Sequence, residues 1–299
     1  MIASQGATMM RLSNRLRRIA APILILSLAA GVPVIARPTP AGTVAHERLL
    51  PLQGGRNFRD LGGYRAADGR SVKWGVLFRS GSMHGLTEAD YRSLEARGIR
   101  VVCDFRDRRE RANEPATWPA PGAPRVLSDD YDLDMHFLPA GSPKSWTPDQ
   151  VRAAMTNAYP AMLGQFNGQY RRMFAELLAG HAPLAFNCSA GKDRTGIAAA
   201  LLLTALGVPR KDVIADYLLT NRYLDASALT KGTPNPANPL AGLPPETAKP
   251  LMAADAAYIE AALAVVDAHK DGAKGYFRDE MGLSAADLTK LRNAYLVRA

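Results

Sequence analysis

The chain has 299 residues, 47% of them apolar and 22% charged, which is ordinary for a globular protein that buries a core. Its net charge is +9, but residues 1–36 hold four Arg and no Asp or Glu, so the remainder carries 9 − 4 = +5. With no Lys/Arg run and no interleaved aromatic stripe, this mild excess excludes a nucleic-acid groove. Two cysteines without histidines at a suitable spacing exclude a four-ligand zinc site.

The N-terminal segment has the layout of a secretory signal. Four arginines between residues 11 and 18 precede residues 19–36, which are apolar apart from Ser27 and end in Val34-Ile35-Ala36. A signal peptide is therefore expected over residues 1–36, with export to the periplasm or out of the cell and no stable membrane insertion after cleavage. A retained membrane anchor is the main alternative, although Pro22 and Pro33 interrupt the apolar stretch. A cytosolic protein is the third.

The next part of the chain predicts a strand–helix–strand order. Asp68-Gly69 lies between two strand-like runs and indicates a hairpin, and residues 76–78 form a short strand. Thr87 caps a helix that ends near Gly98, and the β-branched run at residues 99–103 follows as a buried strand. This order favours a parallel α/β sheet.

Residues 131–165 hold Gly141, Pro143 and Pro148 ahead of a helical stretch, and they are expected to form a lid or an inserted helical hairpin. One catalytic domain over residues 45–299 is the simplest account of the rest. Its further expected elements are helices at 169–178, 197–206, 209–223, 254–269 and 284–296, a strand at 183–187, and a surface loop at 232–250.

The stretch from Cys188 to Arg194 lies between the strand at 183–187 and the apolar helix at 197–206. A helix N-terminus offers unpaired N–H groups and a partial positive charge, which suit a phosphate dianion. Gly191 permits the backbone curl that turns these groups inward as a nest. The same field stabilises a thiolate on Cys188. The expected phosphate-binding residues are Ser189, Ala190, Gly191, Lys192 and Thr195.

This loop predicts a cysteine-dependent phosphatase. Cys188 would attack phosphorus and form a phosphocysteine, which splits one hard step into two. The planar fork of Arg194 would take two phosphoryl oxygens, and Thr195 would donate a hydrogen bond to the departing thiolate. An acid would protonate the leaving oxygen and then activate water. No metal or other cofactor is required, because Arg194 and the backbone neutralise the charge.

With these residues the chain resembles the exported or host-directed bacterial members of the tyrosine phosphatase superfamily, which act on both phosphotyrosine and phosphoinositides. The resemblance runs from about Asn57 to the C-terminus and centres on Cys188 to Gly196. Three further segments share it: Asn57-Phe58-Arg59-Asp60-Leu61-Gly62-Gly63, Phe78-Arg79-Ser80-Gly81 and Asp216-Tyr217-Leu218-Leu219-Thr220-Asn221.

The resemblance implies a short parallel sheet flanked by helices, with a helical lid over the site. It implies Cys188 as the nucleophile, Arg194 as the phosphate clamp and Asp193 as the general acid. It also implies that Lys192 favours acidic substrates such as inositol phosphates. The substrate would be a phosphorylated protein or a phosphoinositide, and the enzyme a protein-tyrosine or dual-specificity phosphatase.

Some assignments stay open. Asp104 and Asp60 are rivals of Asp193 for the acid, because each lies at or near a strand end in a family-like segment. Asn187 stands where the family usually has a His that braces the loop, so a phosphate-binding module without turnover is one alternative. An exported inositol polyphosphate phosphatase using the same loop is another. In an oxidising compartment Cys188 could also pair with Cys103 as a disulfide.

Overall fold

The computed structural model describes residues 46–134, 136–225 and 243–298, so the expected signal segment lies outside the described residues. The described residues pack as one unit. Among the described residues, no helix combines the length and the apolar character needed to cross a bilayer.

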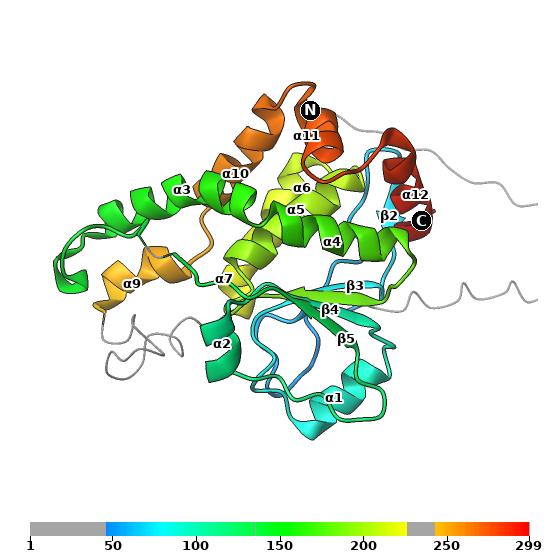
Figure 1. Cartoon of the computed structure of the whole chain (residues 1–299), viewed down its shortest axis with the longest axis horizontal. Coiled ribbons are helices and arrows are strands. Elements are labelled where there is room, and N and C mark those ends of the chain that lie inside the picture. Colours follow the sequence, from blue (N-terminus) through cyan, green and yellow to red (C-terminus); the bar gives the residue numbers. More distant parts are fainter. Residues whose placement is uncertain (1–45, 135, 226–242, 299) are drawn as a thin grey trace, which may run out of the picture. The chain divides into compact units, whose positions relative to one another are not determined.

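Five short strands form the central sheet, in the order β1-β3-β6-β4-β5 (Figure 1). The last four run parallel, and β1 pairs antiparallel with β3. This confirms the predicted α/β fold with a mostly parallel sheet. The strands are β1 (Arg59–Asp60), β2 (Arg70–Val72), β3 (Leu77–Ser80), β4 (Val101–Asp104), β5 (Arg125–Ser128), β6 (Leu184–Asn187) and β7 (Leu296–Arg298).

Helices cover both faces of the sheet. In Figure 1, α4, α5 and α6 lie on one side and α1 on the other. The helices are α1 (Glu88–Glu95), α2 (Arg108–Asn113), α3 (Pro148–Gln165), α4 (Asn167–Leu178), α5 (Asp193–Ala205), α6 (Arg210–Leu218), α7 (Thr220–Tyr223), α9 (Pro245–Met252), α10 (Ala256–Ala268), α11 (Gly272–Asp279) and α12 (Ala285–Tyr295), with a 3₁₀ turn η1 at Pro143–Ser145.

Strand β4 shows how the alternation of side chains builds two cores. Val101 and Cys103 belong to the larger apolar cluster, which includes residues of α3, α4, α5 and α10, whereas Val102 belongs to the smaller cluster with residues of α1. Successive side chains of a strand point to opposite faces, so a β-branched run is buried on both. The predicted strand at 99–103 is therefore confirmed, with its bounds shifted by one or two residues.

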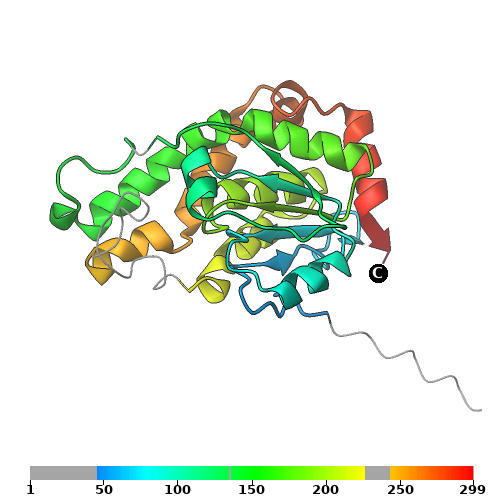
Figure 2. The same cartoon turned by 60° about the horizontal axis from the view of Figure 1, so that its bottom comes forward.

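Local sequence signals account for several helix bounds. Thr87 caps α1 in a capping box with Asp90, as expected. Helix α5 is buried on nearly all sides because its residues from Ile197 to Leu203 are apolar, as the sequence predicts. Helix α3 packs against α9 and α10, and Figures 1 and 2 both show α3 and α9 side by side at one end of the domain.

The hairpin at Asp68-Gly69 is confirmed by the antiparallel bridge between Arg65 and Ser71 and by the hydrogen bond from the amide of Ala66 to the carbonyl oxygen of Arg70 at 2.8 Å, and β2 also pairs with the C-terminal strand β7. Two expectations need correction. The helix expected at 209–223 is divided into α6 and α7 at Leu219. The expected loop at 232–250 ends in helix α9, which Pro245 begins because the first helical N–H has no intrahelical partner to lose.

Candidate active site

The loop from Cys188 to Arg194 connects the middle strand β6 to the buried helix α5. Cys188 is 1% exposed, and Asp193 and Arg194 are the first two residues of α5. Gly191 has a φ of +70°, and a Cβ at this position would lie 2.5 Å from the backbone nitrogen of Gly81. Only glycine therefore fits this step of the loop.

The carbonyl groups of the loop are held on its outer side. The carbonyl oxygen of Ser189 accepts from the amide of Ser82 at 2.9 Å. That of Gly191 accepts from Nδ2 of Asn57 at 3.0 Å and from Nη2 of Arg79 at 2.7 Å. In a planar trans peptide the C=O and the following N–H point in opposite directions, so the next amides are turned toward the inside of the loop. Such convergent amides form a nest for an anion.

Beneath the loop lies a buried charge cluster, which we call the floor network: Asn57, Arg59, Arg79 and Asp216. Oδ1 of Asp216 accepts from Nε of Arg59 at 3.2 Å, and Oδ2 accepts from Nη1 of Arg79 at 2.5 Å. Burial alone would raise the pKa of Asp216, but the charges and hydrogen bonds of the two arginines lower it to about 2. Asp216 thus stays ionised and fixes Arg79, which in turn fixes the Gly191 carbonyl.

Arg194 closes the loop, and its guanidinium is braced from one side. Nη1 donates to Oε2 of Glu110 at 2.6 Å and to the hydroxyl of Tyr131 at 2.7 Å, and Nη2 donates to Oε1 of Glu110 at 2.7 Å. Nη1 also donates to the carbonyl oxygen of Phe105 at 3.1 Å. Among the described residues, none accepts a hydrogen bond from Nε. This N–H and the second Nη2 proton remain for two oxygens of a phosphate.

Glu110 was not predicted as a site residue from the sequence. Its carboxylate also accepts from the hydroxyl of Ser189 at 2.5 Å. Burial favours a raised pKa, but the hydrogen bonds and charge of Arg194, with Ser189, lower the pKa of Glu110 to about 2. The available signal was the capping box of Asp107 and Glu110 directly after a buried strand, which begins α2 beside the loop.

The floor network was also missed as a functional unit. Its members appeared only as parts of the shared segments, without roles. The signal was present, because Arg59 and Arg79 occupy short strands between buried apolar residues such as Phe58 and Phe78. Buried arginines need a buried carboxylate, which Asp216 supplies.

On its other side the loop contacts helices α3 and α9 through Lys192 and Asp193. Lys192 is 1% exposed, and its Nζ donates to the carbonyl oxygens of Leu251 and, at 3.2 Å, of Ala253 at the C-terminal end of α9. Oδ1 of Asp193 accepts from the hydroxyl of Tyr159 in α3 at 2.6 Å, and the Asp193 side chain is 23% exposed. We call these interactions the lid contacts, because α3 lies in the segment that was expected to form a lid. The preference of Lys192 for acidic substrates stays a prediction.

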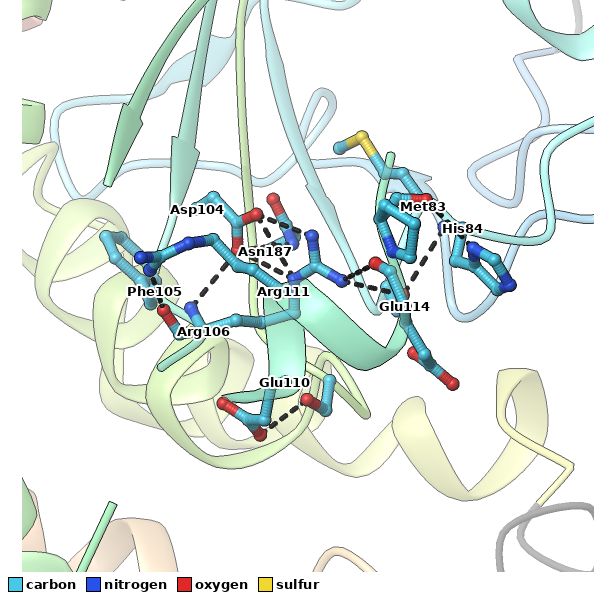
Figure 3. Close-up of polar contacts among 12 residues, drawn as sticks. Met83, His84, Asp104, Phe105, Arg106, Glu110, Arg111, Glu114 and Asn187 are labelled. Atoms are coloured by element: carbon cyan, nitrogen blue, oxygen red, sulfur yellow. Dashed lines mark hydrogen bonds and ion pairs between the residues drawn. The ribbon is translucent and has the colours of Figure 1, made fainter. Parts of the chain in front are cut away.

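The two rival carboxylates have structural partners. Asp104 is paired with Arg106, whose Nη2 lies 2.7 Å from Oδ2, and its Oδ1 accepts from Nδ2 of Asn187 at 3.1 Å (Figure 3). Asp60 accepts from the amide of Gly75 at 2.6 Å, just before β3 begins and therefore at the opposite end of that strand from the loop. The Asn187 amide thus supplies a brace between the loop and β4.

Both cysteines are free thiols in this structure, so the alternative disulfide is not formed. Cys103 lies in β4 opposite Phe186, and burial raises the pKa of its thiol to about 12. Thr195 is fully buried, and its hydroxyl donates to the carbonyl oxygen of Ser80 at 3.4 Å.

Comparisons with known proteins agree with this geometry. The sequence pattern of the tyrosine phosphatase family matches residues 50–297. A Cupriavidus necator protein that carries the name tyrosine-protein phosphatase is 36% identical over 254 residues, which cover 80% of this chain and 85% of that protein. The triple specificity protein phosphatase PtpB of Mycobacterium tuberculosis is 28% identical over 286 residues, covering 82% of this chain and 98% of that protein.

Likeness to solved structures is weaker. A human tyrosine phosphatase-like serine/threonine/tyrosine-interacting protein has 13% identity and a TM-score of 0.31, covering 55% of this chain and 85% of that one. The family assignment rests on the sequence matches, which span most of the chain. The chain belongs to the tyrosine phosphatase family and is a cysteine-dependent protein-tyrosine phosphatase.

Proposed function

We propose that the enzyme hydrolyses phosphotyrosine and, as a second substrate class, phosphoinositides, through a phosphocysteine at Cys188. The observation that carries this proposal is the loop itself. Its carbonyls are held outward by Asn57 and Arg79, and Arg194 is braced by Glu110 with Nε left for phosphate. A broad substrate range is supported by the name of the M. tuberculosis relative, a triple specificity phosphatase.

The reaction would proceed in two displacements. Sγ of Cys188 attacks phosphorus while the bond to the leaving oxygen breaks and Asp193 gives that oxygen its proton. Water then attacks the phosphocysteine, Asp193 takes a proton from it, and the S–P bond breaks to release phosphate. Inward amides and Arg194 stabilise the charge on the equatorial oxygens in both steps.

We further propose that residues 131–165 act as a lid. Tyr131 contacts Arg194, and Tyr159 of α3 contacts Asp193, so both ends of this segment reach the loop. Cys188 is only 1% exposed, so a substrate would gain from wider access to the sulfur than this structure provides. Movement of the lid would provide that access.

Hydrolysis of 4-nitrophenyl phosphate by the wild type, Cys188→Ser and Cys103→Ser tests the nucleophile. We expect Cys188→Ser to lose activity by at least about a thousandfold and Cys103→Ser to keep it. Rapid acid quench followed by mass spectrometry should locate a phosphate on the peptide that contains Cys188. Equal activity of wild type and Cys188→Ser, or no activity in either, would contradict the proposal.

A substrate panel separates the candidate substrate classes. Phosphate release would be measured from a phosphotyrosine peptide, from phosphoinositide in vesicles and from inositol hexakisphosphate. Highest kcat/KM on the peptide and the lipid supports the proposal. A clear preference for inositol hexakisphosphate would instead identify an inositol polyphosphate phosphatase.

We also propose that the protein is exported by a signal peptide over residues 1–36 and belongs to the exported or host-directed type. Four arginines followed by an apolar stretch support this proposal. Cell fractionation with N-terminal sequencing of the mature protein tests it. A mature chain that begins at Met1, Met9 or Met10 and stays in the cytoplasm would exclude export.

A further inference from the structure

A short chain of buried hydroxyl groups ends on the carboxylate of Asp193. The hydroxyl oxygens of Tyr217 in α6 and Tyr159 in α3 lie 2.5 Å apart, and the Tyr159 hydroxyl donates to Oδ1 of Asp193 at 2.6 Å. Tyr159 is fully buried, and its ring also packs against Tyr258 of α10 with centroids 5.6 Å apart. Packing and hydrogen bonding therefore fix the position of this hydroxyl.

The direction of these hydrogen bonds follows from proton counting. The Tyr159 hydroxyl donates its only proton to Oδ1 of Asp193, so the Tyr217 hydroxyl must donate to the oxygen of Tyr159. Burial, followed by the charge of Asp193, raises the pKa of Tyr159 far above its ordinary value. The Tyr159 hydroxyl thus keeps its proton at any working pH and remains a donor.

The two groups that contact the Asp193 carboxylate both lie at Oδ1. Besides the Tyr159 hydroxyl, Nζ of Lys192 lies 3.4 Å from Oδ1. No described residue donates a hydrogen bond to Oδ2. When Asp193 is protonated, its single proton is consequently disfavoured on Oδ1, where it would face a donor hydroxyl and an ammonium group.

We propose that Tyr159 is a positioning residue that confines the acid proton of Asp193 to Oδ2 and holds that oxygen for the leaving group. The proposal rests on the assignment of Asp193 as general acid. Since Tyr159 belongs to the lid helix α3, the acid is positioned only while α3 is packed on the loop. Lid closure and proton donation are thereby coupled through one hydroxyl group.

Leaving-group dependence tests this role. Tyr159→Phe keeps the ring and removes only the hydroxyl, so kcat/KM would be measured with phenyl phosphate, whose leaving group needs a proton, and with 2,4-dinitrophenyl phosphate, whose leaving group does not. We expect a fall of about tenfold for phenyl phosphate and of less than about twofold for the dinitrophenyl ester, because only assisted departure needs the acid. The alkaline limb of the pH profile for phenyl phosphate should also shift.

Tyr258→Phe is the matched control, because it removes a buried hydroxyl from the same aromatic cluster that donates to the carbonyl of Pro250 and not to Asp193. It should leave the ratio of the two rates unchanged. An equal fall for both esters in Tyr159→Phe, or no fall, would overturn the positioning role.

Asp193→Asn separates failure of the inference from failure of the proposed function. If this variant loses phenyl phosphate turnover selectively while Tyr159→Phe does not, the inference is wrong and the acid assignment stands. If Asp193→Asn shows no leaving-group selectivity, Asp193 is not the acid and the inference is overturned with it. The Cys188→Ser result is independent of both outcomes, because it tests the nucleophile and not the acid.

Discussion

Two regions hold the phosphate loop, and they use different chemistry. The floor network joins guanidinium and carboxylate groups from β1, β3 and α6, and the side chains of Arg59, Arg79 and Asp216 are at most 1% exposed. The lid contacts use a hydroxyl group and backbone carbonyls from α3 and α9, and the Asp193 side chain among them is 23% exposed. One region is a buried ionic cluster, and the other combines hydrogen bonds with the ion pair between Lys192 and Asp193.

The floor network and the lid contacts therefore differ in how easily they can be broken. A buried ion pair that loses one partner leaves an uncompensated charge, so the floor network has no low-energy broken state. A hydrogen bond to a partly exposed carboxylate can be exchanged for one to water at small cost. The floor network therefore fixes the Gly191 carbonyl, while the contact at Asp193 is the one that the proposed lid movement would break.

Breaking the floor network should have the largest effect. Asp216→Asn leaves Arg59 and Arg79 without a counter-charge at 1% exposure or less, and we expect a loss of about 3–5 kcal/mol in the free energy of unfolding. Urea denaturation measures it. Asp267→Asn removes a carboxylate from an exposed pair with Arg210 and should cost less than about 1 kcal/mol. Similar losses in the two variants would show that the floor network is not a buried ionic unit.

The same residue predicts an acid dependence. The folded pKa of Asp216 is about 2, below the value of about 4 for an unfolded Asp, so the unfolded state binds more protons between these values. The stabilisation is complete above about pH 4 and is lost as the pH falls through about 2. Wild type should thus lose stability more steeply than Asp216→Asn over this window. Parallel curves would contradict the assigned pKa shift.

The second largest effect concerns the brace of Arg194. Glu110→Gln keeps the shape but removes the charge that holds both Nη atoms, so the guanidinium loses its fixed orientation. We expect kcat/KM to fall about a hundredfold, the usual cost of a misplaced catalytic group. Glu176→Gln, which alters a surface pair with Arg125, is the control and should stay near wild type. Full activity in Glu110→Gln would mean that the loop alone positions Arg194.

Much of the loop and of its surroundings could be predicted from the sequence. Cys188, Gly191 and Arg194 follow a strand and begin a helix, and these local signals suffice to place a nest at a helix N-terminus. The β-branched strands and the capped helix α1 were predictable for the same reason, because their patterns are read within a few residues.

What could not be predicted depends on contacts between distant segments. The pairing of Arg59 and Arg79 with Asp216 spans well over a hundred residues, and no local pattern specifies it. Likewise, β2 pairs with β7 from the far end of the chain, a contact that no local pattern specifies. The hydrogen bond from the Lys192 ammonium to α9 could not be predicted either, because the prolines in residues 232–250 had indicated a loop where this helix forms.

Breaking the lid contact at Lys192 should have a smaller effect than the changes at Asp216 and Glu110. Lys192→Met keeps the apolar stem but leaves the carbonyls of Leu251 and Ala253 without their donor, which should cost about 1–3 kcal/mol of stability. Lys249→Met, on an exposed position of α9, is the control. If Lys192 serves only the lid, kcat/KM falls equally for phosphotyrosine and phosphoinositide substrates. A selective loss on phosphoinositides would show that its ammonium reaches the substrate.

The smallest effect is expected at Asn187, the last residue of β6, which contacts Asp104 of β4. Asn187 lines a cavity of about 290 Å³ on the sheet face that carries α1. Its Nδ2 donates a hydrogen bond to Asp104, and its Oδ1 accepts no hydrogen bond from the described residues. Asn187→His has room in this cavity, and an imidazole N–H can replace the lost donor, so kcat/KM should stay within about threefold of wild type.

Asn187→Leu sharpens the same point, because leucine matches asparagine in size but has no donor for Asp104. Loss of one hydrogen bond to a buried carboxylate is worth about 1.5 kcal/mol, which corresponds to about a tenfold lower kcat/KM if the loop depends on this brace. The two variants, assayed with the same ester, separate shape from hydrogen bonding. Should leucine prove as active as histidine, the hydrogen bond from Asn187 to Asp104 would not be needed to position the loop.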